Sequence, residues 1–176
     1  MKKNIALVAG GYSGEYVISV QSAVTIENNL DSSKYNVYKI IITKESWSHT
    51  GADGQVTEVD KNDFSLTING KKVIFDSVFI GIHGTPGEDG RLQGYFEMLG
   101  IPFTSCGMVT SALTFNKSYC NKVVDALNIV NVSKSVHIFR HQPYNTAEIL
   151  QQLRLPRVRE AGRRGQQHWY VESENR

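Results

Sequence analysis

The sequence HGTPGEDGRLQG, residues 83–94, directly follows an apolar run from Val73 to Ile82, and this junction decides how the chain is organised. Its four glycines and one proline allow the backbone to approach a ligand closely. The same stretch carries three polar side chains that could contact such a ligand, His83, Glu88 and Asp89. A polar, glycine-rich turn between a strand pattern and a helix pattern therefore predicts a functional site at this point.

Strand and helix patterns alternate on both sides of this turn. The strand patterns cover residues 4–9, 35–42 and 73–82, and amphipathic helices are predicted after the Gly10-Gly11 turn and from Gly90 to Leu99. Alternating strands and helices favour a parallel, doubly wound α/β sheet. In such a sheet ligands bind beyond the carboxyl ends of the strands, where both glycine-rich turns are expected to lie.

The rest of the chain divides into an insertion and a second unit. Residues 44–72 are predicted to form a β-rich insertion with hairpin turns at Asp53-Gly54 and Asn69-Gly70. A further strand is expected at residues 101–104. Beyond Gly107 a helix, a strand and a helix are predicted, over residues 111–127, 135–141 and 146–153. This second unit has too little chain to close a hydrophobic core of its own.

Charge and cysteine content restrict the kind of protein. Residues 1–153 carry eleven lysines and two arginines against fourteen acidic residues, so no nucleic-acid partner is expected. Cys106 and Cys120 fit neither a metal site nor a disulfide framework, which favours a reducing cytoplasm. The chain starts Met1-Lys2-Lys3 and passes directly into a short strand pattern. That pattern is too short for a signal sequence or a membrane span, so we expect a soluble cytoplasmic protein without a membrane partner.

The composition changes abruptly near residue 154. Residues 154–176 contain six of the eight arginines in the chain and none of its eleven lysines. Lysine and arginine are both ordinary surface residues, so folding gives no reason for this switch. Such a change is typical of a shift in the reading frame.

Several spaced motifs resemble those of the D-alanine-D-alanine ligases of the ATP-grasp superfamily. In order along the chain they are GGYSGE (10–15) with Ser19, the HG, GEDG and QG elements of residues 83–94, GIPFT (100–104), SA (111–112) and FNK (115–117). The resemblance covers about residues 3–156, and the motifs occur in the order of the family. No single motif would be specific enough, whereas the complete set is.

The resemblance implies a Rossmann-like pre-ATP-grasp domain over residues 1–104 and the incomplete start of an ATP-grasp central domain over residues 105–156. It further implies a cytoplasmic enzyme of peptidoglycan synthesis that uses ATP and Mg²⁺, and a homodimer formed through the N-terminal domain. In the family reaction ATP phosphorylates the carboxylate of one D-alanine. The amine of a second D-alanine then attacks the acyl phosphate and yields D-alanyl-D-alanine.

Four residues carry expected roles in this reaction. Glu15 can accept hydrogen bonds from the ammonium group of the first D-alanine and His83 can bond its carboxylate, and the resemblance assigns both roles. The alternatives are a carboxylate favoured near a helix N-terminus for Glu15 and a structural histidine for His83. Glu88 is expected to support the substrate loop. Lys117 matches the family lysine that reaches the ATP phosphates, the alternative being a lysine on a solvated helix face.

Two other groups are interpreted as structural. Asp89 is expected to cap the helix that follows it. His137 and His141 lie in a predicted strand without a nearby acidic ligand, so no metal site is expected there.

The arginine-rich tail differs from the corresponding segment of the D-alanine-D-alanine ligases that the chain resembles. In that family Leu-Pro is followed by FVKP and a GGSS loop that holds ATP phosphates. Back-translating residues 157–173 and dropping the first base permits VFVKPAEGGSSTGMSKV. Some of these residues are forced by the genetic code, since Trp169 before Tyr170 can give only glycine. We infer a single-base frameshift near residue 157 that destroys the loop and leads to an early stop. The expected result is an inactive, truncated ligase with an out-of-frame tail over residues 157–176.

Two other functions are also compatible with the sequence. The first is a stand-alone α/β domain that binds a small amino acid or a nucleotide without chemistry, which predicts that residues 157–176 form an ordered, packed element. The second treats these residues as an arm that binds nucleic acid or a protein partner. It predicts salt-dependent binding that is lost when the tail is deleted.

Overall fold

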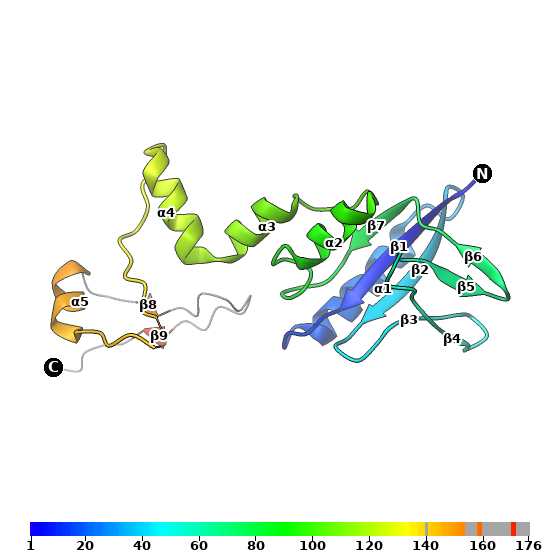
Figure 1. Cartoon of the computed structure of the whole chain (residues 1–176), viewed down its shortest axis with the longest axis horizontal. Helices are drawn as coiled ribbons and strands as arrows, with labels where there is room; N and C mark the ends of the chain where they lie inside the picture. The colour runs from blue at the N-terminus through cyan, green and yellow to red at the C-terminus, as the bar shows by residue number, and fades with distance from the viewer. Residues whose placement is uncertain (140, 154–157, 160–169, 172–176) are drawn as a thin grey trace. The chain divides into compact units, whose positions relative to one another are not determined.

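A computed structural model describes residues 1–139, 141–153, 158–159 and 170–171 of the chain (Figure 1). The chain divides into two compact units, Met1–Ala112 and Leu113–Arg176. The domain boundaries expected at residues 104 and 156 stay predictions. None of the helices in the described ranges is both long and apolar enough to cross a membrane.

The first unit is built on a five-stranded sheet with the order β4-β3-β2-β1-β7. Its strands are β1 (Lys3–Gly10), β2 (Tyr35–Ile42), β3 (Trp47–Thr50), β4 (Val56–Glu58) and β7 (Ser77–Ile80). The central strand β1 pairs in parallel with β2 and β7, whereas β3 and β4 extend the sheet as antiparallel strands. The expected α/β fold with a parallel sheet is therefore confirmed for the core of this unit.

Alternating side chains of β1 supply two hydrophobic layers on opposite faces of the sheet. Ala6 and Val8 belong to the larger core cluster, and Leu7 and Ala9 belong to the smaller one. Helix α1 (Tyr16–Asn29) covers the second face (Figure 1), and its Ala23 is fully buried in the smaller cluster. Both faces of the parallel core are thus buried, as expected when crossover connections cover a parallel sheet.

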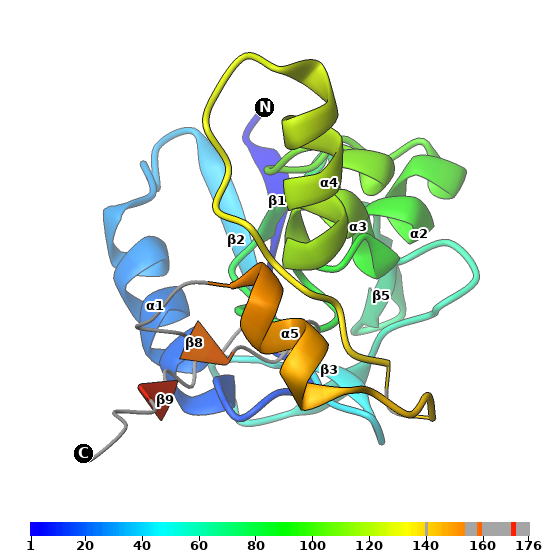
Figure 2. The same ribbon diagram turned by 90° about the vertical axis from the view of Figure 1, so that its left-hand side faces the viewer.

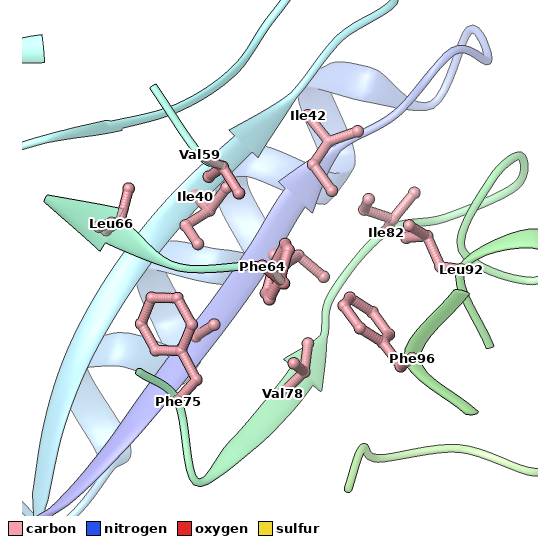
Figure 3. Packing of buried hydrophobic residues seen from close by; sticks show 12 residues of the cluster. Ile40, Ile42, Val59, Phe64, Leu66, Phe75, Val78, Ile82, Leu92 and Phe96 are labelled. Atoms are coloured by element: carbon pink, nitrogen blue, oxygen red, sulfur yellow. The ribbon is translucent and has the colours of Figure 1, made fainter. Parts of the chain in front are cut away.

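The larger core is dominated by aromatic rings (Figure 3). Phe64 and Phe96 are both fully buried, with ring centroids 4.8 Å apart, and Phe64 also packs on Phe75 at 5.6 Å. Phe96 belongs to helix α2 (Arg91–Leu99), which starts directly after the glycine-rich turn. This helix ends as predicted, at a left-handed Gly100. The aromatic cluster thus holds α2, the helix that follows the glycine-rich turn, against the sheet.

The predicted strand over residues 73–82 is divided into two elements. Its start belongs to a hairpin of β5 (Leu66–Ile68) and β6 (Lys71–Val73), closed by the expected Asn69-Gly70 turn. Strand β7 begins only at Ser77, because Asp76 forms a separate link to β1. The Asp76 carboxylate accepts a hydrogen bond from Asn4 N at 2.7 Å, and Asp76 N donates to Asn4 O at 2.9 Å.

The strand predicted over residues 101–104 is reduced to a single parallel bridge between Val78 and Phe103. Val78 N donates to Pro102 O at 2.8 Å, and Thr104 N donates to Val78 O at 2.9 Å. Residue 102 is a proline and has no backbone N–H, which removes one donor from any longer ladder. The segment thus lies beside β7 without becoming a regular strand.

The helix predicted over residues 111–127 is two helices, α3 (Met108–Phe115) and α4 (Lys117–Leu127). The interruption is Asn116, whose extended backbone and side chain cap α4 by accepting a hydrogen bond from Tyr119 N at 3.2 Å. Asparagine is a strong capping residue, and that preference overrides the continuous helical pattern.

The second unit contains α4, α5 (Thr146–Gln152) and a short antiparallel pair, β8 (Val158–Arg159) and β9 (Tyr170–Val171). The prediction of a strand over residues 135–141 is wrong for the described residues 135–139 and 141, which belong to a long irregular connection between α4 and α5 (Figure 2). In that connection His137 Nδ1 lies 2.9 Å from Ser118 Oγ, and its ring stacks on Phe139 at 4.3 Å. These side-chain contacts replace the backbone ladder that a strand would need.

Candidate functional site

The two glycine-rich turns meet at the carboxyl edge of the sheet. The first leaves β1 after Gly10, and the second lies between β7 and α2. Tyr12 N donates to Thr85 O at 2.8 Å, and the Ser13 hydroxyl donates to His83 O at 3.1 Å. Parallel strands bring their carboxyl ends to one edge, and these two hydrogen bonds then tie the turns together. The predicted site is therefore one connected structure.

Glu15 presents an unusual carboxylate in this structure. It occupies the N-cap position of α1, but its side chain makes no capping hydrogen bond. Its Oε2 is buried and has no hydrogen-bond partner among the described residues. Capping therefore does not explain this residue, and a buried unpaired carboxylate oxygen costs free energy unless a cation or a donor arrives to satisfy it.

The second turn approaches Glu15 at Gly84. A Cβ atom at residue 84 would lie 2.8 Å from Ser13 Oγ and 3.0 Å from Glu15 Oε2, and the backbone φ there is +72°. Only glycine accommodates both the contact and this conformation. The Glu88 carboxylate accepts a hydrogen bond from Gly84 N at 2.7 Å, so Glu88 stabilises the conformation of the turn to which both residues belong.

His83 lies in the turn beyond β7, which ends at Ile80. The side chain is half-buried, and its Nε2 lies 3.2 Å from the hydroxyl of Ser22 on α1. Within the described part of the chain, its Nδ1 makes no hydrogen bond. One ring nitrogen is therefore held by the protein, and the other is available to a ligand.

Two serines of α1 contribute to the site without having been singled out as site residues. Ser19 is fully buried and links both strands, accepting from Gly10 N at 2.9 Å and donating to Gly81 O at 2.7 Å. Ser22 follows three positions later and reaches His83. Their i, i+3 spacing, which places both on one face of a helix, is the sequence signal that could have indicated them.

The other candidate residues lie elsewhere. Gly90 occupies the N-cap position of α2, but the capping hydrogen bond comes from Asp89, as expected: its carboxylate accepts from Arg91 N, the first residue of the helix, at 3.4 Å. The same carboxylate also pairs with the Arg91 guanidinium at 2.5 Å. Lys117 is the first residue of α4 in the second unit. Among the described residues, His, Cys, Asp and Glu side chains form no group of three that could hold a metal ion.

The fold is an α/β domain that carries a carboxylate and an imidazole on two turns joined by hydrogen bonds at one edge of its sheet. The sequence profile of the family described as D-ala D-ala ligase N-terminus matches residues 4–106. The chain belongs to this family.

Individual relatives agree with that assignment. A D-alanine–D-alanine ligase of Parabacteroides distasonis is 49% identical over 156 residues, which cover 89% of this chain and 47% of the relative. The crystal structure of the VanG D-Ala:D-Ser ligase from Enterococcus faecalis has a TM-score of 0.81 at 30% identity, covering 99% of this chain and 57% of that one. D-alanyl-alanine synthetase A from Vibrio cholerae gives a TM-score of 0.65 at 36% identity, with coverages of 74% and 39%. The chain spans about half the length of the curated relatives it matches.

Proposed function

We propose that this chain supplies the binding site for the first D-alanine of an ATP-dependent D-alanine–D-alanine ligase. The observation that carries the proposal is the buried, unpaired Oε2 of Glu15 beside the His83-Gly84 turn. An amino acid brings the complementary pair of charges, an ammonium group for the Glu15 carboxylate and a carboxylate for the His83 imidazole. A ligand without a hydrogen-bond donor would leave the Glu15 oxygen unsatisfied.

The reaction would join two D-alanine molecules for peptidoglycan synthesis in the cytoplasm. A phosphoryl group passes from ATP to the carboxylate held by the site, and the amine of the second D-alanine displaces phosphate from the acyl phosphate. Glu15 would fix the ammonium end and His83 the carboxylate end, which orients the acceptor oxygen. Glu88 would act indirectly, by holding Gly84 N in place.

ATP and Mg²⁺ belong to the proposed ligase as a whole. Lys117 would contribute a positive charge toward the ATP phosphates. The described residues offer no cluster of carboxylates that fits Mg²⁺, so no step is derived through the metal in this chain.

Site variants in an in-frame ligase test these roles. Replacing His83 by alanine should weaken the use of D-alanine, whereas Lys117→Ala should chiefly raise the KM for ATP, because the two residues contact different substrates. Steady-state kinetics with each substrate varied in turn measure this. An equal effect of both variants on D-alanine and on ATP would contradict the assigned roles.

We also propose that residues 157–176 are translated out of frame. The absence of lysine from residues 154–176 and the permitted FVKP and GGSS sequence in the shifted frame support this. Most of this segment lies outside the described residues. Sequencing the DNA across codons 150 to 165 tests the proposal, because the expected codons read through Phe-Val-Lys-Pro once the frame is restored. DNA that encodes residues 157–176 without that sequence in the shifted frame would refute it.

A homodimer through the first unit completes the proposal. Helix α1 supports it, since residues 16–26 carry no charge and Val17 and Ile18 expose 60% and 54% of their surface. An apolar helix face can pair with its own copy across a two-fold axis. Light scattering of Ile18→Lys should then show a monomer, and Ile74→Lys, at a residue that is 65% exposed in the connection between β6 and β7, should leave the dimer intact. A dimer that survives Ile18→Lys would exclude this face.

A further inference from the structure

Helix α1 is attached to the substrate edge by two hydroxyl groups, one helical turn apart. Ser19 holds the backbone of Gly81, and Ser22 reaches the imidazole of His83 two residues further along the same segment. The first contact fixes where the segment runs, because Ser19 is fully buried and bonded to two strands. The second contact acts on the His83 ring itself.

The contact between Ser22 Oγ and His83 Nε2, 3.2 Å long, can have either polarity. A neutral imidazole has one N–H group and one acceptor nitrogen, whereas a hydroxyl group can donate one hydrogen bond and accept others. If Nε2 donated to Ser22, the Ser22 proton would have no acceptor among the described residues. Nδ1 would then present a lone pair to the site, which repels a carboxylate.

The opposite polarity satisfies both atoms of this contact, because the Ser22 proton then has an acceptor and Nε2 has a donor. The Ser22 hydroxyl donates to Nε2, and the ring proton then resides on Nδ1, the nitrogen without a partner in the described structure. We propose that Ser22 is a positioning residue that holds His83 in the Nδ1–H tautomer, so that the imidazole presents a donor to the carboxylate of an amino acid. The identity of that ligand rests on the proposed function, but the tautomer is a property of the free chain.

Nitrogen-15 NMR of the 176-residue chain at about pH 8.5, where an imidazole is neutral, reports the tautomer directly. His83 in the wild type should show a protonated Nδ1 and an unprotonated Nε2. Ser22→Val should shift His83 toward the Nε2–H form. Ser22→Thr should preserve the wild-type pattern, because threonine has the shape of valine but keeps the hydroxyl group. Thr25→Val is the control, because the Thr25 hydroxyl bonds only the Gln21 carbonyl, at 3.5 Å.

The wild-type spectrum alone can overturn the proposal, so it does not depend on the variants folding. A dominant Nε2–H tautomer in the wild type would contradict it, and so would an unchanged tautomer in folded Ser22→Val. Addition of D-alanine separates this inference from the proposed function. If the Nδ1–H tautomer is present but D-alanine leaves the His83 signals unmoved, the Ser22 assignment is supported and the proposed ligand is not.

Discussion

At the scale of single residues, the first unit places a destabilising group where a ligand is expected. One buried oxygen of the Glu15 carboxylate has no hydrogen-bond partner in the part of the chain that the structure describes, although neighbouring groups such as Gly84 N and His83 O are hydrogen-bonded. Proteins tolerate such unsatisfied groups mainly at functional sites, where a ligand satisfies them. The same residue should therefore lower stability and support binding.

Glu15→Gln should stabilise the ligand-free chain, because a neutral amide costs less to bury than a carboxylate oxygen. We expect a rise in Tm of about 2 to 4 °C, measured by circular dichroism. Glu27→Gln is the matched control on the same helix, since Glu27 pairs with Lys39 at 2.6 Å and gains nothing from neutralisation. A lower Tm for Glu15→Gln than for Glu27→Gln would show that the Glu15 carboxylate is already satisfied.

Gly84→Ala should be more destabilising than Gly70→Ala. Both glycines have nearly the same left-handed backbone, with φ of +72° and +73°, so the conformational strain is matched. A Cβ at residue 84 would meet Ser13 and Glu15, whereas nothing lies within 4 Å of one at residue 70. The additional cost should be about 1 to 3 kcal/mol in urea unfolding. Equal costs would mean that the two turns do not approach each other as described.

At the scale of elements, the site depends on how α1, β7 and α2 are held against β1. Ser19 fixes α1 to the ends of β1 and β7 by hydrogen bonds. Helix α2 is held instead by aromatic packing, through Phe96 and Phe64. The geometry of the glycine-rich turn between β7 and α2 is therefore set by a core lying beneath it.

Phe96→Ala should remove about 3 to 5 kcal/mol from the free energy of unfolding, because it leaves a cavity among packed rings. Met98→Ala on the same helix is the control, since Met98 is 82% exposed and should cost less than about 0.5 kcal/mol. Denaturant unfolding followed by fluorescence measures both. A small loss for Phe96→Ala would contradict the packing shown in Figure 3.

The elements that could be predicted from the sequence were those in which local and tertiary preferences agree. The apolar run of β1, the Gly10-Gly11 turn and the Gly100 helix end all had strong local signals, and the structure has them in place. The break between α3 and α4 and the late start of β7 depended instead on single polar side chains, Asn116 and Asp76. The spacing from Ser19 could have indicated the helix face of Ser22, but not its contact, because its partner His83 lies 61 residues away in the sequence.

At the scale of the whole molecule, the described site is one part of the machinery that the proposed reaction requires. It is proposed to hold an amino acid, but phosphoryl transfer also needs groups that neutralise and position the ATP phosphates. The sequence after residue 153 provides no lysine for that purpose. Binding and catalysis should therefore be separable in this polypeptide.

The 176-residue polypeptide should form no D-alanyl-D-alanine, even with ATP and Mg²⁺ in excess, because charge neutralisation supplies most of the rate of phosphoryl transfer. Phosphate release in the presence of D-alanine measures this, with the Glu15→Gln variant as the background. Release that depends on D-alanine and exceeds this background would contradict the expected inactivity of the truncated chain.

Glu15 is proposed to hold the ammonium group of D-alanine in a ligase, and steady-state kinetics of the frame-restored protein measure that contribution. The restored protein should form D-alanyl-D-alanine. Glu15→Gln should lower its kcat/KM for D-alanine by roughly 10- to 100-fold, the value of one charge-assisted hydrogen bond, while the KM for ATP stays unchanged. A restored protein that makes no dipeptide, or a Glu15→Gln variant that uses D-alanine as well as the wild type does, would contradict the account.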